Sequence, residues 1–151
     1  MPSVSSPGQQ PPRFFLDRSL GRNAVPEALR ADSWDIVTLA EHYGVPADEQ
    51  VADVDWIEEA ARHGWPILMK DKRIRHRRAE IDAVVSHQAR CFVITRGDLR
   101  SADMVARIIV NQAAILSAAS QSGPYIYAVQ MDRLSRLYPP LLNDSETWTA
   151  T

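Results

Sequence analysis

Short apolar runs alternate with helical patterns along most of this chain, and this alternation restricts the fold more than any other feature. The runs have the length of buried strands and end in polar turns. Strands that are connected through helices form parallel sheets with both faces covered. We therefore expect an α/β fold with a mostly parallel sheet of about five strands, which are Phe14–Leu16, Asp35–Leu39, Pro66–Met69, Cys91–Thr95 and Pro124–Val129.

Helical spacing of apolar side chains marks the segments between these strands. Pro26 suits the first turn of one helix, and Asp53 suits the N-cap of another that ends at Gly64. A short helix is expected around Ala79–Val85. The longest helix is expected to open near Ser101 within the segment GDLRSADMVARIIVNQAAILSAAS.

The distribution of proline sets the expected domain limits. The chain has 151 residues and 45% hydrophobic content, which suits a single domain. Four of its prolines lie within residues 1–12, and two more stand at Pro139 and Pro140. We expect one domain over residues 13–138, with flexible tails at residues 1–12 and 139–151.

The formal net charge of −2 gives no reason to expect a nucleic-acid partner, but the charges are sorted along the chain. Between Ala31 and Ala61 there are many acids and no Lys or Arg. Between Arg62 and Arg78 the only acid is Asp71, in a segment that is otherwise rich in Lys and Arg.

Several functional classes find no support. The single cysteine, Cys91, excludes an intramolecular disulfide and is expected to be buried, which fits a reducing cytoplasm. No apolar stretch is long enough to span a bilayer, and no signal peptide is recognisable, so we expect a cytoplasmic protein with no membrane partner. The histidines His42, His63, His76 and His87 have no metal-ligand spacing, and no Gly-rich phosphate loop is present.

Three carboxylates are expected at one edge of the sheet. Asp17 directly follows the first strand, and Asp71 follows the third after one lysine. Ligands of open parallel sheets bind at the carboxyl ends of strands, and a helix that runs antiparallel to its strands would bring Asp53 to the same edge. Carboxylates that repel one another need a cation, and their hard oxygens suit Mg²⁺ or Mn²⁺. Such an ion can activate water for attack on a phosphodiester.

The basic segment KDKRIRHRR surrounds this edge with charge that suits phosphate. We expect Lys70, Lys72, Arg73 and Arg75 to bind the backbone of an RNA without reading its sequence. A solvated helix face and loop is the alternative for this run.

The segments FFLDRSLG and DVDWIEEAARHGWPILMKDKRIR resemble the PIN-domain nucleases, in particular the compact PIN-like group of VapBC-type toxin–antitoxin modules. In that pattern one aspartate ends the first strand, and a second opens a helix of the form D-x-x-x-x-x-x-A-x-x-x-G. The helix leads into a strand that ends in T-x-D, and Asp53, Ala60, Gly64 and Asp71 stand at matching places. The resemblance implies a metal-dependent endoribonuclease that is the toxin of a pair with a cognate antitoxin.

The chain departs from the family pattern at several positions. Met69 replaces the threonine before the last aspartate, and Arg73 and Ile74 stand where a further acid is often found. The family also has a second carboxylate between the first strand and the Asp53 helix, for which Glu41 is the best candidate. Asp55 is an alternative to Asp53 as a metal ligand.

Other interpretations stay open at this point. Asp17, Asp53 and Asp71 could be a loop start, a helix cap and a salt-bridge partner. The chain could be a non-catalytic PIN-like scaffold or RNA-binding protein, or a PIN-like nuclease for processing RNA or DNA outside a toxin–antitoxin system. A phosphoryl-accepting α/β domain is disfavoured because Gln130 and Met131, not lysine, follow the last expected strand. A homodimer has no motif that supports it.

Overall fold

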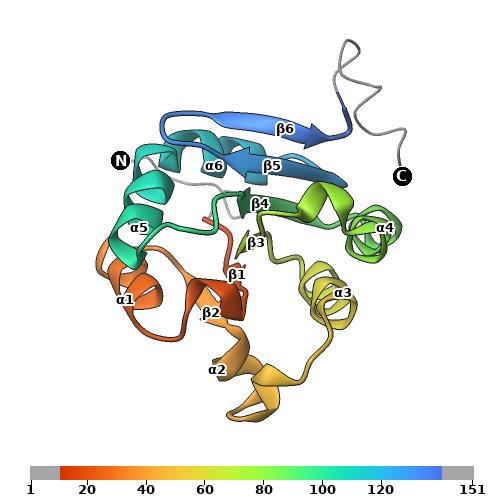
Figure 1. Cartoon of the computed structure of the whole chain (residues 1–151), viewed down its shortest axis with the longest axis horizontal. Helices are drawn as coiled ribbons and strands as arrows, with labels where there is room; N and C mark the ends of the chain where they lie inside the picture. The colour runs from red at the N-terminus through yellow and green to blue at the C-terminus, as the bar shows by residue number, and fades with distance from the viewer. Residues whose placement is uncertain (1–10, 141–151) are drawn as a thin grey trace.

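A single six-stranded sheet forms the centre of the molecule in a computed structural model, which describes residues 11–140 (Figure 1). The strand order is β2-β1-β3-β4-β5-β6. Neighbouring strands from β2 to β5 pair in parallel, and β6 pairs antiparallel with β5 at one edge. The strands are β1 (Phe14–Leu16), β2 (Ile36–Thr38), β3 (Ile67–Lys70), β4 (Arg90–Ile94), β5 (Tyr125–Val129) and β6 (Leu134–Tyr138).

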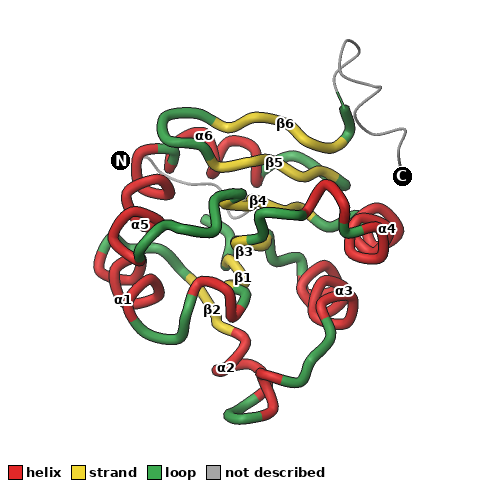
Figure 2. Tube along the Cα trace, viewed as in Figure 1, coloured by secondary structure: helices red, strands yellow, loops and turns green. Residues whose placement is uncertain are grey.

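Helices connect the parallel strands, as Figure 2 shows by colour. The α-helices are α1 (Ala24–Ala31), α2 (Leu39–Tyr43), α3 (Asp53–His63), α4 (Arg78–His87), α5 (Ser101–Val110) and α6 (Gln112–Ala119). Short 3-10 helices are η1 (Arg18–Leu20), η2 (Ala47–Glu49) and η3 (Ile74–His76). The expected α/β class with a mostly parallel sheet is confirmed, with one strand more than expected.

Both faces of the sheet are covered, because successive strand residues point to opposite sides. Phe15 belongs to a buried cluster with residues of α3 and α4. Phe14 and Leu16 belong to a second cluster with residues of α1, α5 and α6. The same division is visible in Figure 1, where α3 and α4 lie on the opposite side of the sheet from α1 and α5.

The sequence did not predict β6. A four-residue turn leads into it, in which the backbone N–H of Gln130 donates to the carbonyl of Arg133 at 2.9 Å. The strand LSRLY buries only Leu137 fully, so its pattern lacks the continuous apolar run of the central strands. An edge strand with one covered face gives a weaker signal than a central strand does.

The long helix expected from Ser101 onward is broken, and this expectation was wrong. Helices α5 and α6 meet at Asn111 and are bent by 66° relative to each other. The buried amide of Asn111 donates to the carbonyls of Arg107 at 2.8 Å and Gln130 at 2.9 Å, which ties the break to the end of β5. Within residues 11–140, no single helix is long and apolar enough to cross a membrane, and only the bent pair α5–α6 passes that test together.

Two other boundaries differ from expectation. The second strand ends at Thr38, because Thr38 and Glu41 form a capping box that begins α2 at Leu39. Asp53 is the first residue of α3 and not its N-cap, which is Ala52. The described elements run from Phe14 to Tyr138, and the expected tails lie largely outside the described residues.

The strand order reverses beside β1, since β2 lies on one side of it and β3 on the other. In doubly wound sheets this switch point is where ligands bind, beyond the carboxyl ends of the strands. The carboxyl ends of β1 and β3 are followed by Asp17 and Asp71.

Candidate metal centre

Three aspartates lie near the switch point, and each of them is close to an arginine. Arg18 Nη1 is 4.0 Å from Asp17 Oδ1, and Arg18 Nη2 is 3.9 Å from Asp53 Oδ1. Arg77 Nε is 3.0 Å from Asp71 Oδ2. The hydrogen bond with Asp71 is the main cause that raises the pKa of Arg77, and the nearby charge of Asp53 adds to the rise. The three carboxylates therefore share one electrostatic neighbourhood.

Asp17 is the most buried of the three, with a side chain that is 8% exposed. Its Oδ2 accepts hydrogen bonds from Ser19 Oγ at 2.6 Å and from the Ser19 N–H at 3.3 Å. Its buried Oδ1 has no hydrogen-bond donor in the described part of the chain. Burial raises the pKa of Asp17, hydrogen bonding from Ser19 opposes this, and the charge of Asp53 adds to the rise.

Asp53 is positioned by its own helix and not by helix capping. Trp56, one turn later in α3 and fully buried, donates its indole N–H to Asp53 Oδ1 at 3.0 Å. The N-cap of α3 has no side-chain hydrogen bond. Asp53 is therefore not the helix cap that the sequence suggested.

Asp71 is fixed by the strand that it follows. Its N–H donates to the carbonyl of Ile94 at 2.9 Å, which extends the β3–β4 pairing by one residue. Its side chain is 10% exposed and accepts the N–H of Arg73 at 2.8 Å on Oδ1. The remaining partner is Arg77, so the salt bridge considered for Asp71 does exist.

The three aspartates supply oxygen donors that suit a hard divalent cation, but among residues 11–140 their carboxylates do not all lie within 4.8 Å of one another. All the converging side-chain oxygens belong to carboxylates, the ligands that Mg²⁺ and Mn²⁺ favour. Oδ1 of Asp17 is buried without a donor, and an acceptor in that position is costly unless a cation or another donor completes it. Arg18 and Arg77 supply positive charge that offsets the carboxylate charges at this edge. A bound metal would take over part of this role.

Glu41 and Asp55 lie apart from this cluster. Glu41 accepts Arg30 Nη2 at 2.6 Å and the N–H of Thr38 at 3.1 Å, and the bond from Arg30 lowers its pKa. Asp55 is exposed, and its charge contributes to raising the pKa of Tyr43. No interaction among residues 11–140 links either carboxylate to Asp17.

Sequence reasoning missed the residues that hold the centre in place. Ser19 connects two strands, because its Oγ donates to Asp17 and accepts the N–H of Lys70 at 2.9 Å. Arg18 also donates to the carbonyl of Val51 at 2.7 Å. The spacing D-x-S after a strand is the only sequence signal that could have pointed to Ser19.

A second missed contact is the ion pair of Arg22 with Asp48. The guanidinium of Arg22 donates two hydrogen bonds to the Asp48 carboxylate, from Nε to Oδ2 at 3.1 Å and from Nη2 to Oδ1 at 2.8 Å. The Asp48 side chain is 1% exposed, and Arg22 lowers its pKa. This pair attaches η2 to the segment that follows η1.

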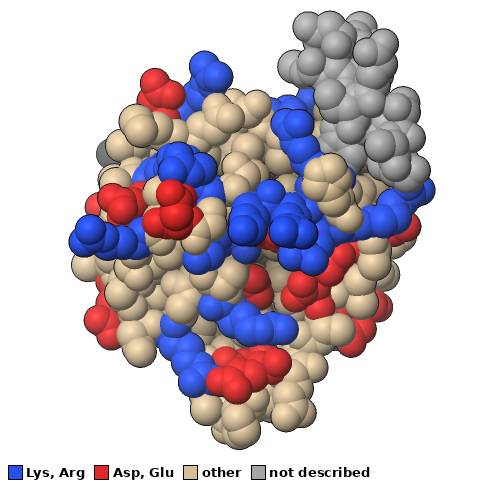
Figure 3. All heavy atoms as spheres, in the orientation of Figure 1, with Lys and Arg blue, Asp and Glu red and all other residues tan. Residues whose placement is uncertain are grey.

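Basic side chains gather in a band across the face shown in Figure 3, with acidic side chains below it. Lys72 and Arg75 line a cleft of about 240 Å³ with Thr95 and Gln130, beyond the ends of β3 and β4. The four bases predicted to bind RNA form no ion pair among residues 11–140. Lys70 is half-buried, and the other three are exposed, namely Lys72, Arg73 and Arg75.

The family model described as "PIN like domain" matches residues 12–96, which include Asp17, Asp53 and Asp71. The chain belongs to the PIN-like domain family. A protein of Mycobacterium tuberculosis (strain ATCC 25618 / H37Rv) named "Putative ribonuclease VapC45" is 38% identical over 124 residues, which are 82% of this chain and 90% of that protein. No solved structure matches the chain significantly. The resemblance inferred from the motifs is thus confirmed.

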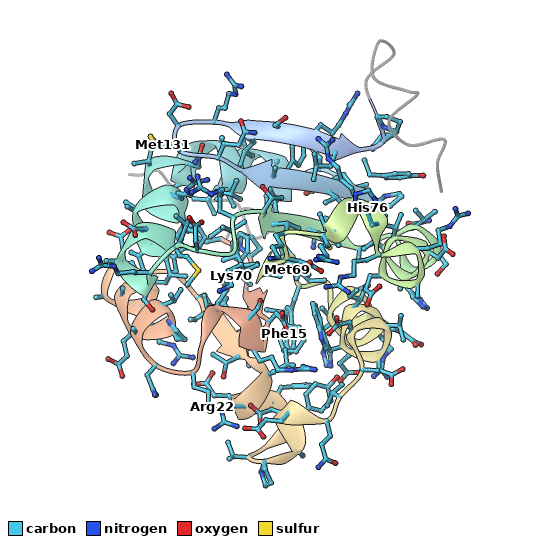
Figure 4. The ribbon with its side chains drawn as sticks, in the orientation of Figure 1. Phe15, Arg22, Met69, Lys70, His76 and Met131 are labelled. Carbon is cyan, nitrogen blue, oxygen red and sulfur yellow. The ribbon has the colours of Figure 1, made fainter. Side chains whose placement is uncertain are left out.

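Met69 stands where the family pattern has a threonine, and it is a core residue in this PIN-like domain. Figure 4 labels Met69 and Lys70 at the end of β3, near the centre of the molecule. Met69 is 3% exposed and packs in the cluster beneath α3 and α4. Its side chain serves the core, so the hydrogen bonds at the edge of this PIN-like domain come from Ser19 instead.

Proposed function

We propose that this PIN-like protein is a metal-dependent endoribonuclease in which Asp17, Asp53 and Asp71 hold Mg²⁺ or Mn²⁺. The observation that carries the proposal is the buried Oδ1 of Asp17, which lacks a donor and shares the electrostatic neighbourhood of Asp53 and Asp71. The bound ion would supply an activated water and polarise the phosphodiester.

The side chains of the protein do the positioning. Ser19 fixes the orientation of Asp17 relative to β3, and Trp56 fixes that of Asp53. Arg18 and Arg77 keep the carboxylates together before an ion binds. Glu41 stays outside the proposed ligand set because Arg30 and Thr38 already bind its carboxylate. Asp55 also stays outside the set, because it is exposed and its charge acts on Tyr43.

Lys70, Lys72, Arg73 and Arg75 would bind the phosphates of the RNA. Their support is location, since they follow β3 next to Asp71 and two of them line the adjacent cleft. Contacts to phosphate orient a nucleic acid without reading its bases, so the target sequence would be selected elsewhere.

We further propose that the protein is the toxin of a toxin–antitoxin pair. The support is the relative in Mycobacterium tuberculosis that is named "Putative ribonuclease VapC45". Induced expression would then arrest growth, and co-expression of a small protein encoded beside it would restore growth. Normal growth under induction of active protein would instead favour a role in RNA or DNA processing.

The test of the nuclease is cleavage of a labelled RNA with Mg²⁺, with Mn²⁺ and with excess chelator. We expect cleavage with either ion and none with chelator. The double variant Asp17→Asn with Asp71→Asn should be inactive. Unchanged cleavage by that variant would remove these aspartates from the mechanism.

A non-catalytic scaffold is the second candidate, and specific observations favour it. Met69 replaces a polar family residue, and Arg18 and Arg77 already neutralise the aspartates. Calorimetric titration separates the two functions. A scaffold would show no divalent-metal site that Asp71→Asn abolishes, whereas the nuclease would.

A further inference from the structure

A second group of potential metal ligands lies in the C-terminal half of α3 and on α2. Glu59 and His63 stand one turn apart on α3, and His42 comes from α2. Glu59 and His63 follow Asp53 by six and ten residues, so about 9 Å and about 15 Å of helix separate them from this residue of the proposed nuclease centre. The two sites can therefore be occupied independently.

The two histidines converge on one carboxylate oxygen of Glu59. His42 Nε2 lies 2.7 Å from Glu59 Oε2, and His63 Nε2 lies 3.2 Å from the same oxygen. One ligand atom from each of the three residues lies within 4.8 Å of the others. Sequence spacing missed this group because His42 is on another element.

These separations fit the coordination sphere of a small transition-metal ion. Zinc bonds to histidine nitrogen and carboxylate oxygen are about 2.0–2.2 Å long, so neighbouring ligand atoms of a tetrahedral ion lie about 3.4 Å apart. Two imidazoles and one carboxylate form a donor set that suits zinc and differs from the all-carboxylate set at the aspartate edge. We propose that His42, Glu59 and His63 form a Zn²⁺-class transition-metal site that joins α2 to α3.

The surroundings hold the three ligands in place. The ring of His63 stacks on Trp65 with centroids 4.3 Å apart and planes 12° apart. The ring of His42 packs edge-on against Phe15 at 5.7 Å and against Trp65 at 5.4 Å. Rings that are fixed by packing lose less rotational freedom when an ion binds, which favours affinity.

Glu59 can bind an ion without losing its other partner. Its Oε1 accepts a hydrogen bond from Arg62, while both histidines contact Oε2. A ligating carboxylate is commonly oriented by such an outer hydrogen bond. The side chains of His42 and Glu59 are only 20% and 18% exposed, which limits competition from water, while His63 at 42% leaves an entry path.

The alternative is an ion-pair cluster in which protonated histidines bind Glu59 and no metal enters. Titration of the intact protein with Zn²⁺ in a large excess of Mg²⁺ distinguishes the two. Mg²⁺ prefers oxygen ligands and binds imidazole weakly, so it would fill a carboxylate site and leave the two histidines to Zn²⁺. Co²⁺ in place of Zn²⁺ reports the ligands through its visible absorption bands.

We expect one Zn²⁺ per chain under these conditions and a tetrahedral Co²⁺ spectrum. His63→Gln and Glu59→Gln should each weaken Zn²⁺ binding at least tenfold and abolish the Co²⁺ bands. His87→Gln is the matched control, because His87 also lies near an α3 glutamate, Glu58 at 3.9 Å, but outside the cluster. Its affinity should stay within twofold.

His63 is exposed at the end of α3, so His63→Gln should fold normally, and the melting temperature without metal checks this. The proposal is overturned if the native protein shows no Zn²⁺ binding in excess Mg²⁺. It is also overturned if His63→Gln binds Zn²⁺ as tightly as His87→Gln does. Neither outcome depends on ribonuclease activity, so the proposed nuclease can fail or succeed separately.

Discussion

Ser19 donates both its hydroxyl and its N–H to one oxygen of Asp17, Oδ2, and leaves the other oxygen, Oδ1, buried without a donor among residues 11–140. A carboxylate whose two oxygens differ in this way is oriented on one side and open on the other. The open oxygen faces the side where Arg18 approaches at 4.0 Å. We infer that the open oxygen is available to a cation, and that without a cation the buried carboxylate destabilises the folded protein.

Asp17→Asn should stabilise the metal-free protein near neutral pH while it abolishes cleavage. Burial raises the pKa of Asp17, so the folded state holds the proton more tightly than the unfolded chain does. Ionised Asp17 therefore opposes folding, and the penalty develops as pH rises through the raised pKa. The melting temperature of the variant should exceed that of the native protein at pH 7 by a few degrees, and the difference should shrink below pH 4.

Metal should reverse the order of stability. Mg²⁺ or Mn²⁺ should raise the melting temperature of the native protein, because a ligand that binds only the folded state stabilises it. The Asp17→Asn variant should respond much less. An equal metal-induced shift in both proteins would show that Asp17 is not a ligand.

Asp53→Asn and Asp55→Asn form a matched pair on one helix. Asp53 lies 3.9 Å from Arg18 and accepts the indole N–H of Trp56, whereas Asp55 is exposed. We expect Asp53→Asn to lower the rate of RNA cleavage by about 100-fold, the upper end of the range seen when residues that orient metal ligands are replaced. Asp55→Asn should stay within about twofold, and the reverse ranking would assign the ligand to Asp55.

Removal of the basic side chains after β3 should weaken RNA binding in a salt-dependent way. Each lost phosphate contact reduces the slope of log affinity against log salt by about 0.7 for a single strand. Replacing Lys72, Arg73 and Arg75 by alanine should therefore make the slope shallower by about 2. The control is Arg78→Ala, because Arg78 pairs with Asp82. An unchanged slope in the triple variant would place the RNA elsewhere.

Glu41→Gln tests whether a fourth carboxylate belongs to the centre. Glu41 and Arg30 are 45% and 42% exposed, and a glutamine retains the capping box with Thr38. The free energy of unfolding should fall by less than about 1 kcal/mol, as is usual for exposed ion pairs. Cleavage should stay within about twofold, and a loss like that of Asp53→Asn would add Glu41 to the ligands.

The strands near the switch point were predictable because they are buried on both faces. Phe14–Leu16 and Ile67–Met69 are continuous apolar runs, and an aspartate follows each of them closely. Parallel topology then brings Asp17 and Asp71 to one edge without further information. The convergence of these residues was therefore accessible from the sequence.

Features that depend on contacts between distant segments were not accessible. The break at Asn111 depends on the carbonyl of Gln130, and the orientation of Asp17 depends on Ser19 and Lys70. The group of His42, Glu59 and His63 spans two helices, so no spacing rule could find it. In each case the partner is set by tertiary packing and not by local pattern.

Calorimetric titration of Mn²⁺, an ion that prefers oxygen ligands, into the native protein and Asp71→Asn decides whether a metal centre exists at this edge. Asp71 follows β3 beside the switch point and adjoins Asp53 through Arg77. We predict one Mn²⁺ site in the native protein, weakened at least tenfold in Asp71→Asn and retained in Asp55→Asn. Equal Mn²⁺ affinity of the native protein and Asp71→Asn would contradict the assignment of a metal centre to this edge of the sheet.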